Sequence, residues 1–571
     1  MRIIIDGHAA EAGACESFRE LTDRLGLSGE RLSERVLAVR AGGRIVPLNC
    51  VPARTGAGLT PERDYARCLE KAGHTVASVR ITDPDGAGIY FNTLVFVFML
   101  AMKRLYPEAR VHADYALGNG TVYSVLGVPA LTEEDVCRIR SECTAICGED
   151  LPLVRERVYT DDAIDEFRAQ GREDAAELLG WRILPYFDLY RAGGMSDYYY
   201  GEMLPSTGYV TVFGLELMPT GRLLLLPPDP ADAERPARSA ERKKLDAAFR
   251  KSADWNVLMH CMTVADLNRL VRDGGMRDLI RVNEALHEKD YAGIADRVVR
   301  RGAKAVLIAG PSSSGKTTSA NRLCTQLRVF GKQPIPISLD DYYIDRDKCE
   351  VAPDGKVDLE HINCLDVARF GEDLAGLIAG KEVQLPRFDF KLQRSIPDGG
   401  KKIRLGEDSL LVIEGLHGLN PAMLPAGIDR EAVFKVFVSA LTTLNVDSHN
   451  RLNTTALRLM RRMVRDYRTR GASVEDTFGM WDSVRRGEER WIFPFQEEAD
   501  AMFNSSLVYE PVVLKRHIYP LLMAVGPADP HYGTAREMVK FLNYILEQDF
   551  EDEVPPTSVL REFIGGNVFY R

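Results

Sequence analysis

Gly310-Pro311-Ser312-Ser313-Ser314-Gly315-Lys316-Thr317 is the stretch that decides the fold of this chain. It fits the P-loop pattern G-x-x-x-x-G-K-[ST], whose glycines permit a tight loop with backbone N–H groups that face phosphate oxygens. Residues 305–309 form a continuous apolar run typical of a buried strand, and residues 318–323 continue as a helix that we expect to end near Gly331. A Gly/Ser-rich turn is the alternative, but strand, loop and helix stand in the order that the motif requires.

The motif predicts a site for a nucleoside triphosphate. We expect residues 310–317, together with Thr318, to contact the phosphates, helped by the positive end of the helix dipole. Lys316 would reach the β- and γ-phosphates, and the Thr317 hydroxyl would bind Mg²⁺. ATP and Mg²⁺ are therefore the predicted cofactors, with the choice between ATP and GTP left open.

The composition of the 571-residue chain is that of an ordinary soluble protein, with 45% hydrophobic and 27% charged residues. Its length predicts about three or four domains. The net charge of −10 argues against a general nucleic-acid binder. The ten cysteines form no C-x-x-C pair and no secretory signal begins the chain, so we expect reduced thiols in a cytoplasmic protein. The most apolar segment, 94–102, is shorter than the ~20 residues that span a bilayer and predicts a buried core helix.

The order of the patterns predicts a multidomain protein in which an α/β P-loop domain follows α+β domains. In the P-loop domain, apolar runs alternate with helical patterns, so we expect a parallel sheet with helices on both faces; the runs after the first are 334–339, 409–413 and 433–438. The Pro/Asp/Ala-rich stretch 226–232 is the strongest linker signal. The predicted units are a small module at 1–58, an α+β domain at 59–228, a helical region at 229–300, the P-loop domain at 301–515 and a helical extension packed on it at 516–571.

Two acidic residues follow predicted strands, at the sheet edge where ligands of such sheets bind. Asp340 comes directly after the run 334–339, and we interpret it as the group that orients or deprotonates an acceptor hydroxyl. The alternative is an Asp that caps a turn, the structural role that we give to its neighbour Asp341. Glu414 follows the run 409–413 in the Walker-B position, which predicts a Mg²⁺ ligand in preference to a chance carboxylate.

Residues 386–394, PRFDFKLQR, interleave aromatic and polar side chains. Such a segment can clamp a planar base while Gln393 or Arg394 hydrogen-bonds its edge. An ordinary edge strand would show the same pattern.

A helix face rich in arginine is predicted after residue 454. Residues 454–471 hold six arginines and one Asp, and four of the arginines recur at i, i+3, i+4 and i+7, namely Arg458, Arg461, Arg462 and Arg465. Because these side chains have no matching acids in the segment, they would repel each other unless a polyphosphate binds them. We interpret the face as a lid that closes over ATP and stabilises the transferring phosphoryl group, although charged runs are more often solvated.

These clusters, in this order, resemble the uridine kinase and phosphoribulokinase branch of P-loop kinases over residues 300–510. The resemblance is carried by Gly310–Thr317, Ser338–Tyr343, Phe388–Phe390, Glu414–Gly415 and Arg458–Arg462. It implies that Asp340 activates a ribose 5′-hydroxyl and that Arg458 and Arg462 act in catalysis.

The same resemblance implies an acceptor site. Tyr343 and Glu360 would hold the nucleoside, with Phe388 and Phe390 against the base; Arg458 and Arg461 would also contact the substrate. Phe388 replaces the usual tyrosine, and Gln393 stands where these kinases have a histidine that reads the pyrimidine. The identity of the base therefore stays open.

The front half is similar to the N-terminal region of threonyl-tRNA synthetase. Residues 1–55 suggest its small ubiquitin-like module, and residues 60–225 its second domain, chiefly through 186–191 and 196–201. The helix at 92–97 lacks the H-x-x-x-H pair of that domain, so hydrolytic editing is not expected. The whole chain resembles bacterial nucleoside kinases with such an N-terminal extension.

Three functions follow from these patterns. The first is an ATP-dependent nucleoside 5′-kinase of uridine or cytidine type. The second is a kinase for another small metabolite, such as the sugar phosphate ribulose 5-phosphate, against which the aromatic pair Phe388 and Phe390 argues. The third is a nucleotide-controlled RNA-binding regulator. A small-molecule acceptor is the expected partner, without membrane or nucleic acid, and a homo-oligomer is left open.

Overall fold

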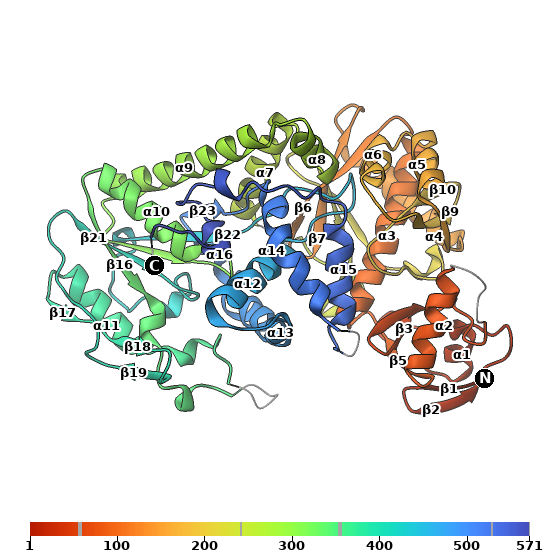
Figure 1. Ribbon diagram of the computed structural model, residues 1–571, viewed down its shortest axis with the longest axis horizontal. Helices are drawn as coiled ribbons and strands as arrows, with labels where there is room; N and C mark the ends of the chain where they lie inside the picture. The colour runs from red at the N-terminus through yellow and green to blue at the C-terminus, as the bar shows by residue number, and fades with distance from the viewer. Residues whose placement is uncertain (55–59, 240–241, 352–356, 527–528, 570–571) are drawn as a thin grey trace.

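The computed structural model describes residues 1–54, 60–239, 242–351, 357–526 and 529–569. The molecule is elongated, with the N-terminal sheet at one end and the P-loop sheet at the other (Figure 1). Two late helices, α14 (Glu510–Ala524) and α15 (Tyr532–Leu542), lie in the middle, so the chain returns there after completing the P-loop sheet.

The first sheet has five strands in the order β2-β1-β5-β3-β4. Its elements are β1 (Arg2–Ile5), β2 (His8–Glu11), α1 (Phe18–Arg24), β3 (Ala38–Ala41), β4 (Arg44–Pro47), α2 (Pro61–Lys71) and β5 (Thr75–Val79). Ser17 begins α1 through a capping box with Glu20. Because β5 lies between β1 and β3, this sheet extends past the boundary that the sequence predicts at residue 58.

The next part is α+β, as predicted. It contains α3 (Pro84–Leu105), β6 (Arg110–Leu117), β7 (Gly120–Leu126), α4 (Glu133–Gly148), β8 (Val154–Tyr159), α5 (Thr160–Ala169), α6 (Glu173–Gly180), β9 (Tyr186–Ala192), β10 (Met195–Asp197), β11 (Gly214–Leu217) and β12 (Leu223–Leu226). Its sheets have the orders β11-β12-β7-β6 and β10-β9-β8. Helix α3 is longer than the apolar segment that predicted it: its 22 residues have the length and composition of a membrane span, but 67% of the apolar window is buried inside the protein.

The predicted linker at 226–232 is wrong. Most of this stretch belongs to strand β12 and to a hairpin of β13 (Pro228–Asp229) and β14 (Asp232–Pro236), in which Asp229 pairs with Asp232. The prolines that suggested a linker stand at the ends of these short strands, where no ladder hydrogen bond is lost. The three helices α7 (Lys243–Leu258), α8 (Val264–Arg272) and α9 (Met276–Arg301) follow, whereas the first part of the predicted helical region at 229–300 holds strand β14.

The P-loop region has the predicted parallel sheet, in the order β16-β21-β15-β22-β23. The strands are β15 (Ala305–Ala309), β16 (Gln333–Ser338), β21 (Ser409–Glu414), β22 (Val433–Ser439) and β23 (Ala501–Asn504), the last of which the sequence did not reveal. Its helices are α10 (Lys316–Val329), α11 (Val367–Ile378), α12 (Thr454–Arg470) and α13 (Val474–Trp491). Short strands β17 (Val383–Gln384), β18 (Arg387–Asp389), β19 (Arg394–Ile396) and β20 (Lys402–Ile403) form two hairpin-like pairs beside α11.

Helices cover both faces of this sheet. Val306 and Ile308 of β15 pack with α9 and α10, whereas Ala305 and Leu307 pack with α11. This alternation follows from the period of two residues in a strand. The P-loop strand is therefore buried on both sides, and its carboxyl end opens onto the site.

The two halves of the chain share a hydrophobic core. One cluster joins α5, α6 and β9 to α8, α12, α13, α14, α15 and the short C-terminal helix α16 (Arg561–Ile564). Polar contacts reinforce the junction: Arg182 donates to the Tyr544 hydroxyl at 2.9 Å, and the Ser448 amide donates to Asp174 at 2.9 Å. The C-terminal extension thus packs against both the P-loop region and the N-terminal half.

Candidate active site

The P-loop turns from β15 into α10 through residues with left-handed backbone angles. Gly315, which caps α10, has φ +85° and Ser313 has φ +59°. A Cβ atom on Gly310 would lie 1.9 Å from the Val438 carbonyl oxygen, so only glycine permits the loop to pack against β22. The helix ends as the sequence predicts, at Phe330 followed by Gly331 with φ +78°.

Side chains from later in the chain hold the carbonyl groups of the loop. Arg458 Nε donates to the Ser312 carbonyl at 2.9 Å, and Arg461 Nη1 donates to the Ser313 carbonyl at 3.5 Å. The Ser505 hydroxyl donates to the Ser314 carbonyl. With three successive carbonyls bound from the α12 side, the loop backbone is fixed before any ligand arrives.

Two carboxylates bind N–H groups of the P-loop and α10, and sequence reasoning missed both. Glu488 of α13 is fully buried and accepts from the Ser312 amide at 2.9 Å. Glu562 of α16 accepts from the Thr318 amide at 3.1 Å and from the Thr318 hydroxyl at 2.8 Å. Their positions, more than 170 residues after the motif, give no local signal that could have revealed them.

The arginine face of α12 is largely buried, and the prediction that it lacks acidic partners is wrong. Arg458 forms an ion pair with Glu488, and Arg461 forms one with Glu510 at 2.7 Å. These acids come from α13 and α14, outside the segment from which the balance was judged.

The other two arginines of the face share an acid of their own helix. Arg462 and Arg465 contact Asp466 at 3.2 and 2.8 Å. Arg462 Nη1 also donates to the Ser312 hydroxyl at 2.7 Å. Three arginines of the face, Arg458, Arg461 and Arg462, therefore contact the P-loop, and Arg462 does so through a side chain of the loop.

Lys316 is buried among acids. Burial lowers the pKa of its ammonium group, and four carboxylates oppose this shift, namely Glu414, Glu562, Asp340 and Glu360. The Lys316 ammonium donates to the Pro311 carbonyl at 3.1 Å. Thus the predicted residues Lys316, Asp340, Glu360 and Glu414 do converge on one site.

The acids of this site hold their protons unusually strongly. Burial, with the nearby Asp340 charge, raises the pKa of Glu414 to about 7. Burial, with Glu488, raises the pKa of Glu360 to about 7. Burial also raises the pKa of Asp340, although Lys316 opposes that shift. A carboxyl group whose pKa is raised toward 7 can exchange a proton near neutral pH.

The donor set fits a magnesium ion. Glu414 ends β21 beside Ser338, its register partner in β16, and the Ser338 hydroxyl donates to it at 3.1 Å. In the part of the chain that the structure describes, no three His, Cys, Asp or Glu residues are grouped to enclose a metal ion. Mg²⁺ is commonly bound by one or two carboxylates together with substrate phosphates, so Glu414 and Thr317 suffice. A cation here would also relieve the crowding of buried acids around Lys316.

An aromatic group lies on the acceptor side of Asp340. Tyr343 lies with its ring centre 5.7 Å from that of Phe388, and Phe388 lies 5.1 Å from Phe390 in an edge-on arrangement. The Asp341 carboxylate accepts from the Phe388 amide at 3.4 Å, which fits a structural role. Gln393 stands at the exposed turn between β18 and β19 with φ +54°, at the rim of this group.

Residues 305–509 match the model of the phosphoribulokinase / uridine kinase family. This region is therefore similar to the P-loop kinases of that family. The match contains the P-loop, Asp340, Glu414 and the α12 arginines, and it ends before the C-terminal segment that carries Glu562.

The N-terminal part of the chain is similar to threonine–tRNA ligases. It is 33% identical to the ligase of Paraburkholderia phytofirmans over 147 residues, which is 25% of this chain and 23% of the ligase. With the ligase of Symbiobacterium thermophilum it shares 32% identity over 189 residues, 33% of this chain and 26% of that one. The chain thus spans about a quarter of the length of these curated relatives.

Two solved structures resemble this chain at lower levels of identity. A protein described as a possible uridine kinase from Bacillus stearothermophilus is 19% identical, with a TM-score of 0.23 over 35% of this chain and 89% of that one. D-Glycerate 3-kinase from Cryptococcus neoformans is 14% identical, with a TM-score of 0.21 over 47% of this chain and 89% of its own. These likenesses do not bear on the substrate of this chain.

In the synthetase-like half, Asn92 of α3 has a structural place. Its side-chain amide donates to the carbonyls of Tyr200 and Glu202 at 3.2 and 3.4 Å. One turn later, Phe96 is fully buried in the core. These two residues, which lie in the helix without the histidine pair, therefore help to fix α3 to the segment that follows β10.

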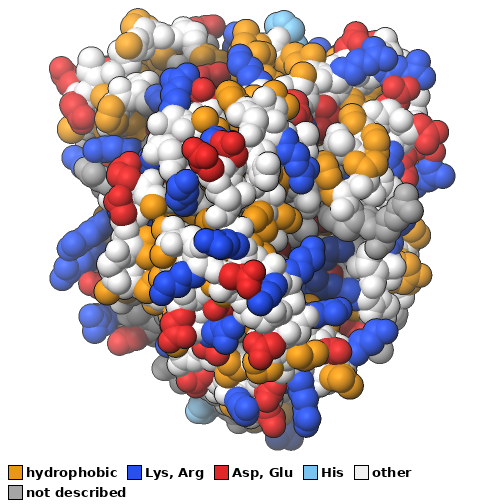
Figure 2. All heavy atoms as spheres, turned by 90° about the vertical axis from the view of Figure 1, so that its left-hand side faces the viewer, with side chains coloured by type: hydrophobic (Ala, Val, Ile, Leu, Met, Phe, Trp, Pro, Cys, Tyr) orange, Lys and Arg blue, Asp and Glu red, His pale blue; other side chains and the backbone are white. Residues whose placement is uncertain are grey.

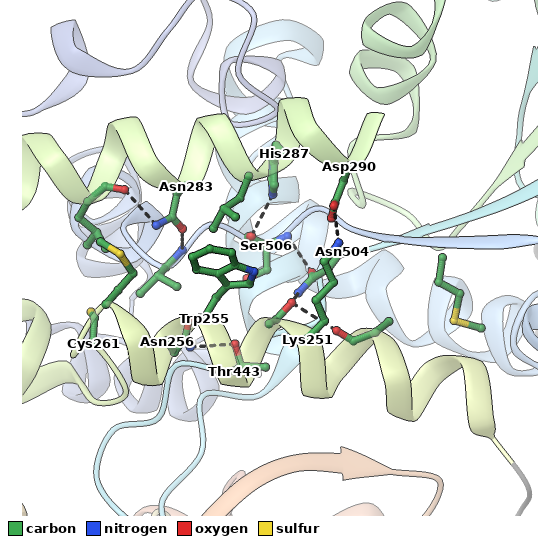
Figure 3. Close-up of a pocket in the computed structure, with 17 residues that line it drawn as sticks. Lys251, Trp255, Asn256, Cys261, Asn283, His287, Asp290, Thr443, Asn504 and Ser506 are labelled. Atoms are coloured by element: carbon green, nitrogen blue, oxygen red, sulfur yellow. Dashed lines mark hydrogen bonds and ion pairs between the residues drawn. The ribbon is translucent and has the colours of Figure 1, made fainter. Parts of the chain in front are cut away.

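A separate, partly open pocket of about 80 Å³ lies between α7 and α9 (Figure 3). Its polar groups are mostly paired: Asn256 donates to Thr443 at 2.9 Å, Asn283 accepts from the Val508 amide at 3.1 Å, and Lys251 pairs with Asp290. Burial lowers the pKa of His287 to about 3, which keeps its ring neutral. We interpret this pocket as a gap in the packing between two helices and not as a ligand site.

The outer surface at the P-loop end carries mixed charge. In the view that faces this end, Lys and Arg side chains are interspersed with Asp and Glu (Figure 2). The described part of this face thus shows no extended basic stripe of the kind that follows a nucleic-acid backbone.

Proposed function

We propose that this chain is an ATP-dependent kinase that transfers the γ-phosphoryl group to the 5′-hydroxyl of a nucleoside. The observation that carries the proposal is the convergence of Lys316, Asp340 and Glu414 at one end of the P-loop sheet, beside the aromatic group of Tyr343, Phe388 and Phe390. The first three residues supply what phosphoryl transfer needs, and the aromatic group fits a planar base.

In this proposal each residue of the chain has a defined task. The P-loop amides and Lys316 bind the phosphates, and Asp340 accepts the proton of the acceptor hydroxyl as that oxygen attacks. Thr317 and Glu414 would hold Mg²⁺, which would supply positive charge to neutralise the phosphates. Arg462 is the arginine placed to stabilise the phosphoryl group, because it reaches the Ser312 side chain. Arg458 and Arg461 hold the loop in position through hydrogen bonds to its carbonyl groups.

A direct activity screen distinguishes a nucleoside acceptor from other acceptors. The purified protein with ATP and Mg²⁺ is incubated with a panel of nucleosides and, in parallel, with ribulose 5-phosphate. We expect a nucleoside monophosphate as the product with the highest kcat/KM. If only the sugar phosphate gave a product, the protein would be a metabolite kinase instead of a nucleoside kinase. If the protein bound ATP but gave no product with any acceptor, a kinase function would be contradicted. Filter binding of tRNA at two salt concentrations tests the RNA-binding alternative.

The role of Asp340 is tested by Asp340→Asn, which removes the proton acceptor but keeps the shape of the side chain. We expect kcat to fall by about 10²- to 10⁴-fold, with ATP affinity nearly unchanged. Asp347→Asn, at an exposed position nearby, is the matched control and should leave both unchanged. Equal losses of turnover and ATP affinity would contradict the assigned role.

A further inference from the structure

The C-terminal segment of residues 558–567 lies against the P-loop. A Cβ atom on Gly315 would meet a methyl group of Val559 at 2.4 Å, and the Phe563 ring lies 5.0 Å from the Arg461 guanidinium. Helix α16 is drawn beside α10 and α12 in Figure 1, and it packs on α12. The segment is anchored by side chains that are at least 99% buried, namely Val559, Leu560, Phe563 and Ile564.

Glu562 extends from this anchored segment to the start of α10. Its carboxylate accepts from both the amide and the hydroxyl of Thr318. Thr318 is the third residue of α10, so its amide is one of the four that have no acceptor within the helix. Amides in this position after a P-loop are the ones that cradle a nucleotide's α- and β-phosphates. A carboxylate therefore occupies donors that the motif provides for a phosphate.

We propose that Glu562 is an internal competitor of the nucleotide, which must turn away from Thr318 before the phosphates of ATP can bind there. This inference rests on the proposed function, because it requires that the P-loop bind a nucleoside triphosphate. It adds a residue that lies outside the family match and that regulates access to the site.

Two physical reasons make the carboxylate and the phosphate mutually exclusive. The amide hydrogen and the hydroxyl hydrogen of Thr318 each serve one strong acceptor at a time. In addition, two anions at hydrogen-bonding distance from the same residue repel strongly where little water screens them. Lys316 already faces three further acids, so it cannot neutralise both groups.

The side chain of Glu562 can leave while the segment stays docked. Glu562 is only half-buried, whereas its apolar neighbours Phe563 and Ile564 are buried in the shared core. A rotation of one side chain costs far less than the exposure of these apolar groups. The competitor is therefore built to be displaced by a ligand of sufficient affinity.

The test measures ATP affinity of the full chain by calorimetry for the wild type, Glu562→Ala and Glu562→Gln. Charge-assisted hydrogen bonds of this kind correspond to about tenfold to a hundredfold in affinity, so we expect Glu562→Ala to bind ATP at least about tenfold more tightly. Glu562→Gln removes the charge but keeps an acceptor and should fall between the two. Asp552→Asn, at an exposed acid shortly before this segment, is the matched control and should equal the wild type.

Adenosine and thermal unfolding separate competition from a purely structural role. Adenosine has no phosphate, so its affinity should be the same in Glu562→Ala and the wild type. The free variant should melt at a lower temperature, because α10 loses a capping carboxylate, while ATP should raise its melting temperature by more than it does in the wild type. Lower thermal stability with equal or weaker ATP binding would overturn this inference alone. Failure of every variant and of the wild type to bind ATP would overturn the proposed function and this inference with it.

Discussion

The acids around Lys316 make the site sensitive to pH at the scale of single residues. Glu414 has a pKa of about 7 in the folded chain against 4.5 for an ordinary Glu, so between these values the folded state holds a proton that the unfolded state has released. The free energy of unfolding of the ligand-free protein therefore falls as the pH rises from about 5 to about 7. The metal needs the ionised carboxylate, so its binding changes in the opposite direction.

We therefore expect the Mg²⁺-dependent part of ATP affinity to weaken as the pH falls below about 7, by up to about tenfold per pH unit. Titration calorimetry from about pH 5 to about pH 8, with and without Mg²⁺, measures this dependence. In Glu414→Gln the dependence on Mg²⁺ and most of its variation with pH should disappear together. Affinity for MgATP that is constant over this range would contradict the metal role of Glu414, and Glu407→Gln at an exposed position serves as the control.

At the scale of elements, the buried contacts of helix α12 hold the P-loop in position. This structural role does not depend on the closure over ATP that the sequence predicts. Arg461 is fully buried and forms two hydrogen bonds with Glu510, at 2.7 and 2.9 Å, beside its contacts with Ser505 and Ser313. Removal of one partner from such a buried pair leaves the other charge without compensation. The stability of α12 in its place therefore depends on residues that bind no substrate.

We predict that Arg461→Met lowers the free energy of unfolding by about 3–5 kcal/mol. Arg470→Gln, on the same helix, should cost less than about 1 kcal/mol, because Arg470 is mostly exposed and its contact with Asp466 is 3.5 Å long. Urea denaturation of both variants measures the difference. Similar small losses in the two would mean that α12 is held mainly by its apolar stripe, with the buried ion pair contributing little.

How far the sequence could predict these elements depends on the range of their contacts. Residues 305–331 were predicted closely, because a buried strand, a glycine loop and a helix C-cap each have local signals. Glu488 and Glu510 were missed, and with them the burial of the arginines, because ion-pair partners on other helices leave no local pattern. The stretch 226–232 was misinterpreted because proline marks both linkers and the ends of short strands.

At the scale of the whole molecule, the N-terminal half is fastened to the loop that precedes α12. Asn445, Asp447 and His449 of this loop are buried, and the Ala113 amide donates to the Ser448 carbonyl at 2.7 Å. Arg172 contacts both Asp197, at 3.2 Å, and His449, at 3.1 Å. The synthetase-like half thereby fixes the start of the helix that supports the P-loop, so its packing contributes to the shape of the proposed active site.

Core substitutions in the N-terminal half test this coupling. Leu178 of α6 is fully buried in the cluster that includes α12 and α14, whereas Leu94 of α3 is equally buried in a separate N-terminal cluster. Either change to Ala removes the same atoms and costs about 2–5 kcal/mol locally. We expect Leu178→Ala to lower the temperature at which ATP binding is lost on heating, and Leu94→Ala to lower this temperature less.

The opposite outcome would show that the P-loop region folds independently. In that case both variants would lose ATP binding at the wild-type temperature while their N-terminal halves unfold early. The shared core argues for the first result, because Leu178 belongs to the same apolar cluster as buried side chains of α12, α14 and α15.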